Sequence, residues 1–252
     1  VALLGLVSVL VLLGLVMVLS ASMVSDIQEQ GTAWYSFRRQ AMWAALGVVA
    51  LVVTLRVPYW RWRRVALPLL LVCLGLLVLV LIPGVGITRS GATRWLGFGG
   101  FVIQPAELMK LALVLWIADL LDRRSDRMHI ARATFRPVVV AVGAISLLLL
   151  AQPSQGTLAI IAVIAFVMLF VGGTSMVRLF AWMGAASAAA IALSTVVDYR
   201  RDRLLAFLDP WADSAGIGYQ TVQSTVGIGS GGLLGVGLGE SRAKWGFLPE
   251  AN

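Results

Sequence analysis

The stretch from Pro137 to Val177 reads PVVVAVGAISLLLLAQPSQGTLAIIAVIAFVMLFVGGTSMV and contains no charged side chain. Runs of about 20 apolar residues are long enough to cross the hydrocarbon layer of a membrane as helices. Further charge-free runs cover Val1–Ser25, Val65–Thr88 and Leu179–Val197. Because 60% of the residues are apolar and only 13% are charged, the sequence predicts an all-α polytopic membrane protein.

Seven transmembrane helices can be placed along the chain. The stretch Pro137–Val177 holds two of them, because Gln152-Pro153-Ser154-Gln155-Gly156 interrupts it. Pro83-Gly84 ends an earlier helix, and Pro105 suits the first turn of the next one. The predicted helices cover about 1–24, 37–55, 65–82, 105–121, 137–150, the stretch from the break to 171, and 176–197.

Arginines in the short loops predict the orientation of these helices. Loops 56–64 and 122–136, together with Arg178, carry ten arginines, whereas the loops on the opposite side carry four. Positive charge marks the cytoplasmic side, so the segment after Val197 is predicted to be extracytoplasmic. Residues 1–197 are then the membrane part and residues 198–252 a large outer loop of one domain. The chain starts at Val1 and stops within a motif, and we expect its natural start and end to lie outside it.

Several classes of function are disfavoured by the composition. The net charge of +8 comes largely from short loops between spans, a pattern typical of topology signals and lipid contacts and not of a nucleic-acid groove. Cys73 is the single cysteine and lies in an apolar run, so neither a disulfide nor a cysteine metal cluster is expected. His129 is the single histidine, which disfavours a histidine-based metal site or catalytic triad.

The first polar cluster falls at the predicted outer face. It runs from Thr88 to Trp95 and continues, after a glycine-rich turn, into a helix that starts near Gln104. Glu107 and Lys110 are three residues apart, so they share a helix face and can pair. Ionisable side chains within a membrane helix indicate a functional site. A structural pair that locks this helix to a neighbour is the alternative.

Two further clusters lie at the same predicted face. The break at Gln152–Thr157 is either a tight outer turn or backbone that lines a watery cavity. Arginines between Asp198 and Arg203 either grip a pyrophosphate, which suits their forked donors, or contact anionic lipids. The glycines from Gly229 to Gly239 permit close approach of a ligand, or form a packed loop. Glu250 is either a base or a solvated surface charge.

Together these residues resemble the SEDS family of membrane glycosyltransferases, which includes FtsW, RodA and SpoVE. The matching strings follow one another in the family's order along almost the whole chain. The ending of the first helix and the Pro-Trp after Asp209 favour FtsW over RodA. The strings are Ser20-Ala21-Ser22-Met23, Gly91-Ala92-Thr93-Arg94-Trp95, Gln104-Pro105-Ala106-Glu107-Leu108-Met109-Lys110, Ala151-Gln152-Pro153, Gly156-Thr157, Phe207-Leu208-Asp209-Pro210-Trp211, Gly218-Tyr219-Gln220, Gln223-Ser224, Gly229-Ser230-Gly231-Gly232, Gly237-Leu238-Gly239 and Leu248-Pro249-Glu250-Ala251-Asn252.

The resemblance implies a fold of ten transmembrane helices, seven of which are present. It also implies polymerisation of lipid II into glycan strands of the septal wall, at the outer face of the bacterial plasma membrane. The expected partners are a class B penicillin-binding transpeptidase, other division proteins and membrane lipids. The family's essential aspartate is expected just after Asn252, so Glu250 is not its equivalent and this stretch alone is expected to be inactive. Ser154-Gln155 departs from the usual Asp-Leu of the family and removes one carboxylate from the outer turn.

In the predicted reaction a carboxylate takes the proton of the acceptor sugar hydroxyl, and cations stabilise the departing pyrophosphate. A divalent ion is a candidate cofactor that would also stabilise the pyrophosphate, and no metal ligands are predicted in the chain. The substrate-binding candidates are Arg94, Trp95, Gln104, Glu107, Lys110, Arg200, Arg201, Arg203, Tyr219, Gln220, Gln223, Ser224 and Glu250.

Four alternatives to a division polymerase stay open. A lipid II flippase would use a similar cavity without a catalytic carboxylate, and a RodA-like polymerase would serve elongation. A structural division scaffold would need no chemistry. A secondary transporter would place broken helices at mid-membrane, whereas the polar clusters here gather at one face.

Overall fold

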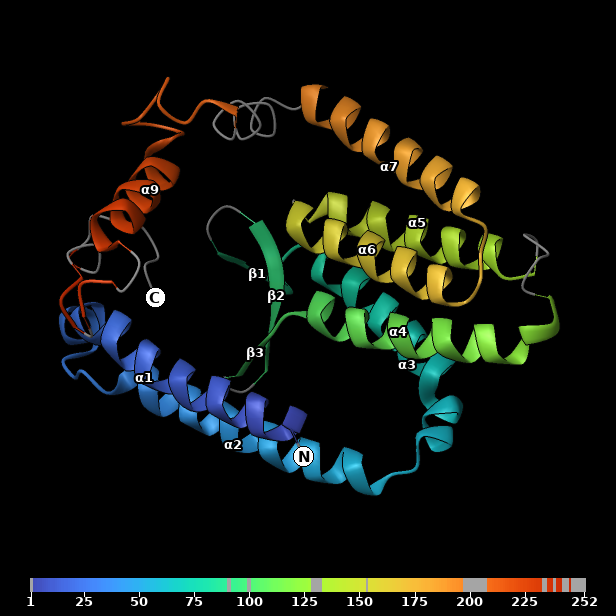
Figure 1. The fold of residues 1–252 in the computed structure, drawn as a ribbon, viewed down its shortest axis with the longest axis horizontal. Helices are drawn as coiled ribbons and strands as arrows, with labels where there is room; N and C mark the ends of the chain where they lie inside the picture. The colour runs from blue at the N-terminus through green and yellow to red at the C-terminus, as the bar shows by residue number, and fades with distance from the viewer. Residues whose placement is uncertain are drawn as a thin grey trace. The chain divides into compact units, whose positions relative to one another are not determined.

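The computed structural model describes most of the chain, and it is mostly helical (Figure 1). Within the described part there are eight α-helices and one three-stranded sheet. The chain divides into two compact units, one formed by residues 57–189 and the other by residues 1–56 with 190–252. The described residues are 2–89, 92–98, 101–127, 133–152, 154–196, 208–232, 235–237, 239–241 and 245.

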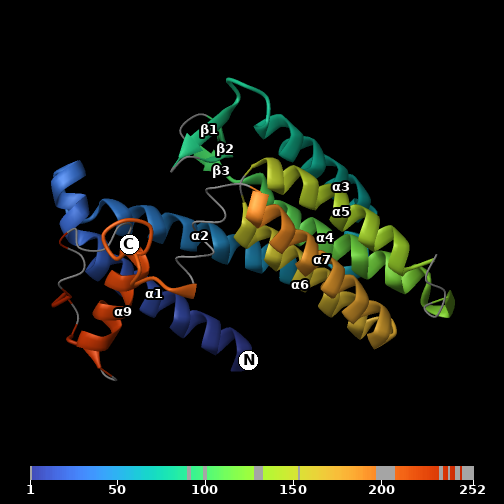
Figure 2. The same ribbon diagram turned by 90° about the horizontal axis from the view of Figure 1, so that it is seen from above.

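Four helices form the core of the unit 57–189. They run alongside one another, as Figure 2 shows, and their contacts close a ring in the order α3, α4, α6, α5. Each helix buries a stripe of apolar residues spaced by three or four positions, such as Met109, Leu113 and Ile117 of α4. The bounds are Tyr59–Val80 for α3, Pro105–Arg123 for α4, Phe135–Ala151 for α5 and Gln155–Val171 for α6.

A small antiparallel sheet connects α3 to α4. Its strands are β1 (Gly86–Arg89), β2 (Ala92–Phe98) and β3 (Phe101–Ile103), in the spatial order β1-β2-β3. Leu96 of β2 is buried and pairs with Ile103 of β3. The sequence analysis predicted only helices and a glycine-rich turn here. The prediction of an all-α fold is therefore incomplete, because the β-branched and aromatic side chains of these short segments favour strands.

Two long helices, α1 (Ala2–Gln30) and α2 (Tyr35–Arg56), pack against each other in the other unit. Their connection is fixed by Asp26, which is buried although it carries a carboxylate. The backbone N–H of Ser36 donates to Asp26 Oδ2 at 2.8 Å, and the Ser36 hydroxyl donates to Asp26 Oδ1 at 2.7 Å. The carboxylate thereby satisfies a free N–H group in the first turn of α2.

Replacing Ser36 by alanine removes one of these two hydrogen bonds. We expect the free energy of unfolding to fall by about 1 kcal/mol, because the second bond remains. Thermal unfolding of the purified protein in detergent measures this change, and the exposed Ser8→Ala, whose hydroxyl bonds only within its own helix, is the control. Equal melting temperatures for Ser36→Ala and the unsubstituted protein would contradict the role given to Asp26.

Two further helices complete the described chain. α7 (Met176–Val196) follows α6 and places Leu179 in the core. α9 (Tyr219–Gly231) lies within the stretch predicted as a glycine-rich outer loop and was not predicted. A short 3₁₀ helix, Ser125–Arg127, follows α4.

Helices form at all seven positions that the sequence predicts, with ends that differ by a few residues. Three of them, α1, α2 and α3, are both long and apolar enough to cross a membrane. The helices at 135–151, 156–171 and 176–192 are apolar but shorter. Large apolar side chains are widely exposed along α1 and α2, as expected for helices that face lipid.

Candidate functional site

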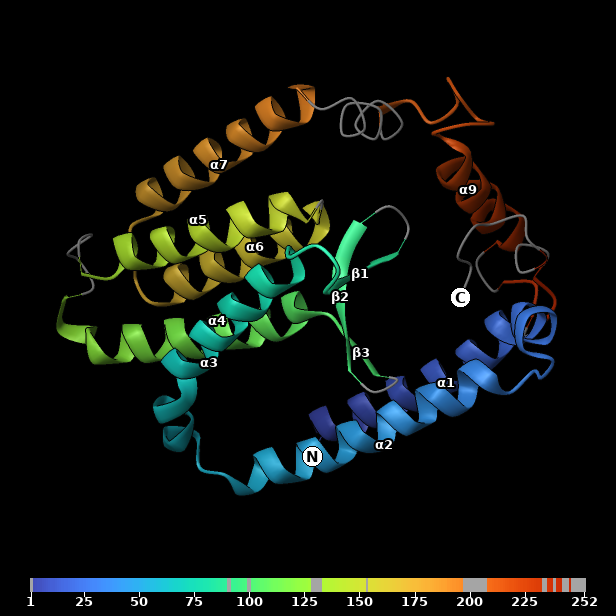
Figure 3. The ribbon, with the colours of Figure 1, turned by 180° about the vertical axis from the view of Figure 1, so that it is seen from behind.

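Two of the predicted polar clusters, at residues 88–110 and 152–157, lie at one end of the bundle of residues 57–189. The sheet, the start of α4 and the turn between α5 and α6 all lie at this end (Figure 3). β2 contacts both α3 and α4. The sequence places these segments far apart, and the fold brings them to one end of four packed helices.

Glu107 and Lys110 form the predicted pair. Lys110 Nζ lies 2.7 Å from Glu107 Oε2, within the first two turns of α4. The Glu107 side chain is 56% exposed and the Lys110 side chain 23% exposed, so the ammonium group is the more sheltered partner. A carboxylate in the first turn is also stabilised by the positive end of the helix dipole. The pair is thus preformed, with its carboxylate at the surface of the bundle.

Arg94 lies at an irregularity of the sheet. Ile87 pairs with Trp95 and Thr88 pairs with Thr93, so Arg94 is the extra residue of a bulge in β2. Such a bulge changes the direction of a side chain. Arg94 Nε donates to the backbone oxygen of Gln152 at 3.1 Å and thereby ties the sheet to the end of α5.

Gln152 links this contact to α3. Its side chain is buried, and its amide Nε2 donates to the backbone oxygen of Leu77 at 2.9 Å. The last carbonyls of a helix have no partner within the helix, and the N–H of Leu81 bonds instead to Val78. Gln152 therefore caps α3 from the end of α5. We call Arg94, Gln152 and the Leu77 carbonyl the capping relay.

The turn after Gln152 is also internally bonded. The Ser154 hydroxyl donates to Thr157 Oγ1 at 3.0 Å, and Ser154 is buried. The family resemblance implies an aspartate at this position, and a neutral hydroxyl occupies it here in a buried place. This bond agrees with a tight turn, one of the two predicted alternatives.

Trp95 and Gln104 lie at the same end of the bundle. Trp95 is partly buried in β2 opposite Ile87. Gln104 precedes α4 in extended conformation, and its side chain makes no capping bond to that helix. Both stay candidates for contact with a substrate.

The remaining described candidates belong to the other unit, on α9. Gln223 follows Tyr219 by four residues, so their side chains share a face, and the Ser224 hydroxyl donates to the backbone oxygen of Gln220 at 2.8 Å. The turn before α9 is held by Asp213, whose two carboxylate oxygens accept the N–H groups of Gly216 and Ile217, each at 3.0 Å. This turn needs glycine at 218, because a Cβ there would meet the backbone oxygen of Pro210.

One contact joins the two ends of the chain within that unit. The N–H of Gly239 donates to Ser20 Oγ at 2.9 Å. Both residues belong to the strings that carry the family resemblance, and 219 positions separate them. Arg200, Arg201, Arg203 and Glu250 lie outside the described residues, and their roles stay predictions.

Metal binding finds no support in the part of the chain that the structure describes. There, no three side chains of His, Cys, Asp or Glu come close enough to hold an ion. Lys110 and Arg94 are cations at the polar end of the bundle, and such side chains suit a ligand with phosphate oxygens.

The sequence analysis missed two features of this region. Gln152 was considered only as part of a loop, although an amide side chain next to a helix break can cap a neighbouring helix. The bulge at Arg94 has no clear sequence signal, because a single extra residue in a strand does not change the composition.

Comparison with known proteins identifies the family of this chain. Residues 1–252 match the protein family described as "Cell cycle protein", which is named after FtsW, RodA and SpoVE. The chain belongs to the FtsW, RodA and SpoVE family. The resemblance inferred from the motifs is thereby confirmed.

Curated relatives from several bacteria share this family. "Probable peptidoglycan glycosyltransferase FtsW" of Geobacter metallireducens is 40% identical over 239 residues, which are 95% of this chain and 64% of the relative. "Stage V sporulation protein E" of Bacillus subtilis is 38% identical over 242 residues, 96% of this chain and 66% of the relative. The chain thus spans about two thirds of the length of these relatives.

Solved structures share the fold. One, described as "Structural coordination of polymerization and crosslinking by a peptidoglycan synthase complex", has a TM-score of 0.68 at 29% identity, over 89% of this chain and 65% of the other. The D255A mutant of the rod shape determining protein RodA of Thermus thermophilus has a TM-score of 0.55 at 26% identity, over 75% of this chain and 58% of the other. With its apolar helices, this family member is a multi-pass membrane protein.

Proposed function

We propose that the full-length protein is a peptidoglycan glycosyltransferase that polymerises lipid II during cell division. The observation that carries this proposal is the match of about 40% identity, over 95% of the chain, to relatives named as FtsW glycosyltransferases. The preformed pair of Glu107 and Lys110 at the polar end of the bundle supports it.

The proposed membrane arrangement follows the family. Seven of ten transmembrane helices lie in this stretch, and the polar end of the bundle faces outward at the septum. Arginines at the opposite end of α3 and α4 support this orientation, since positive charge marks the cytoplasmic side. The sheet and the start of α4 then lie at the membrane surface, where a lipid-linked sugar can be reached.

The proposed reaction joins two sugars. The bond between the donor's anomeric carbon and the pyrophosphate oxygen breaks, and the pyrophosphate leaves with the electron pair. The acceptor hydroxyl forms the new bond to that carbon and gives its proton to a carboxylate, proposed to be the family's aspartate. Lys110 is the proposed cation for the leaving pyrophosphate, because its ammonium group is sheltered and held in place by Glu107.

Arg94 is assigned a positioning role. Its Nε bonds to the backbone of Gln152, so it holds β2 against the end of α5. Trp95 and Gln104 are proposed to contact the substrate from the same end. The α9 residues Tyr219, Gln220, Gln223 and Ser224 are proposed contacts from the outer loop. A divalent ion, if used, is proposed to arrive with the pyrophosphate.

The proposed partner is a class B penicillin-binding transpeptidase. The similarity to the chain of a peptidoglycan synthase complex supports such a partner, since polymerised strands must be cross-linked.

A comparison of two activities separates a polymerase from a flippase. Full-length protein is reconstituted in vesicles, and both polymerisation and transbilayer movement of labelled lipid II are measured. Replacing the family's aspartate, expected after Asn252, by alanine should abolish polymerisation. The proposal would be contradicted if this alanine variant polymerised lipid II at the wild-type rate. It would also be contradicted if the wild-type protein moved lipid II across the bilayer without polymerising it.

A further inference from the structure

A cavity of about 300 Å³ lies at the other end of the bundle, between the first turns of α3 and the last turns of α4. α3 has 22 residues and is therefore about 33 Å long, so this cavity is remote from the polar outer end. Its lining residues are Tyr59, Trp60, Trp62, Arg63, Leu115, Ala118, Asp119 and Asp122.

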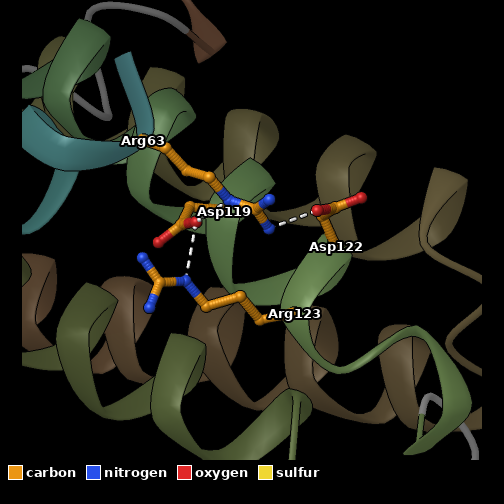
Figure 4. A network of polar contacts seen from close by, with 4 residues as sticks. All are labelled: Arg63, Asp119, Asp122 and Arg123. Carbon is orange, nitrogen blue, oxygen red and sulfur yellow. Dashed lines mark hydrogen bonds and ion pairs between the residues drawn. The ribbon is translucent and has the colours of Figure 1, made fainter. Parts of the chain in front are cut away.

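One wall of the cavity is a network of charges that joins α3 to α4 (Figure 4). Arg63 Nε lies 2.9 Å from Asp119 Oδ1, and the same guanidinium contacts Asp122. Arg123 Nε also contacts Asp119 Oδ1, at 2.8 Å. Two arginines thus balance two aspartates. The carboxylates are occupied by these partners, so the wall offers little attraction to a cationic ligand.

The other walls are aromatic and apolar. The rings of Tyr59 and Trp60 pack edge to face with centroids 5.0 Å apart, which gives a preformed surface. Leu115 and Ala118 line the α4 side. Tyrosine and tryptophan are favoured where a membrane protein meets the boundary between headgroups and acyl chains. An occupant with an apolar chain and a polar head fits this lining.

Positive charge predominates in the two segments that contribute most of the cavity lining. Residues 59–64 and 119–124 contain five arginines and two aspartates, an excess of three positive charges. Arg64 is exposed, and in the described part of the chain it has no ion pair or hydrogen bond from its side chain. It follows Trp60, a lining residue of the cavity, by four residues, so the two side chains are neighbours on the surface of α3. The charge at the opening is complementary to an anionic headgroup.

We propose that this cavity binds one anionic phospholipid of the cytoplasmic leaflet. An acyl chain packs against Trp60, Trp62 and Leu115, and the phosphate is bound by Arg64 with the exposed edge of Arg63. Basic pockets between membrane helices on the cytoplasmic side are suited to anionic headgroups. The charge network holds α3 and α4 at the spacing that keeps the cavity open.

Lipid binding to the purified full-length protein tests the proposal. After delipidation in detergent, the protein is titrated with phosphatidylglycerol or phosphatidylethanolamine, and bound lipid is counted by native mass spectrometry. One phosphatidylglycerol should be retained in preference to phosphatidylethanolamine. Arg64→Gln should weaken its binding about fivefold, the effect expected for one basic residue at a membrane surface. Trp60→Ala should weaken the binding of both lipids.

Matched exposed positions supply the controls. Arg39→Gln and Trp34→Ala change the same residue types on α2 and in the turn before it, and should leave binding unchanged. Trp60 and Arg64 are themselves exposed, so their variants should fold, and their melting temperatures without lipid verify this. Equal binding of the two lipids, or equal weakening by Arg39→Gln and Arg64→Gln, would overturn the proposal. Displacement of bound phosphatidylglycerol by an acidic peptide, which would mark the site as a protein-docking surface, would also overturn it.

Discussion

Replacing Lys110 by alanine should lower the rate of glycan polymerisation from lipid II by about 100-fold in the full-length protein. Removing one preorganised donor that stabilises developing negative charge typically has an effect of this size. Lys110 suits this role because Glu107 fixes its ammonium group 2.7 Å away while the carboxylate lies at the surface of the bundle. The initial rate of polymerisation, measured on gels with labelled lipid II, gives the result.

Two further variants test whether the charge of Lys110 is responsible for this effect. Lys110→Arg keeps a cation and should retain more activity than Lys110→Ala. Glu107→Gln keeps a hydrogen-bond acceptor but removes the charge, and should have a smaller effect than Lys110→Ala. If Lys110→Ala folds normally and polymerises lipid II at the wild-type rate, the pair is structural and only locks α4 in place.

Gln152→Leu should give the second large effect, on stability. The leucine fills similar space but cannot donate, so the Leu77 carbonyl at the end of α3 loses its partner in a buried position. A buried polar group without a partner costs about 1–3 kcal/mol. The Arg94 bond goes to the backbone of residue 152 and should survive, so the loss reports on the side chain alone.

Thermal unfolding in detergent measures this loss. Gln40→Leu on α2 is a suitable control, because Gln40 is exposed. The control should change the melting temperature little, whereas Gln152→Leu should lower it clearly. Similar melting temperatures for the two variants would show that the bond from Gln152 to the Leu77 carbonyl adds nothing to stability.

The helices could be predicted from the sequence because each rests on a local property. Charge-free runs, the break at Gln152–Gly156 and the proline at 105 act within a few residues of the structure that they cause. The family resemblance was equally accessible, since its strings stand in order along the chain. The pairing of Glu107 with Lys110 followed from helical spacing alone.

Features that depend on distant partners could not be predicted. The charge network of α3 and α4 joins Arg63 to Asp119, 56 positions apart, and composition shows only that both residues are present. The bond from Gln152 to Leu77 spans 75 positions. The sheet was missed because its strands are short and lie among glycines. α9 was missed because its glycines disfavour a helix, whereas Asp213 holds the turn before it.

The most direct test of the central claim is a polymerisation assay with labelled lipid II. Full-length protein is incubated with and without a class B penicillin-binding partner, and the products are separated by length on a gel. The predicted result is a ladder of glycan strands, with more polymerised product when the partner is present. Unpolymerised lipid II in both reactions, from protein that is folded and in complex with its partner, would contradict the claim.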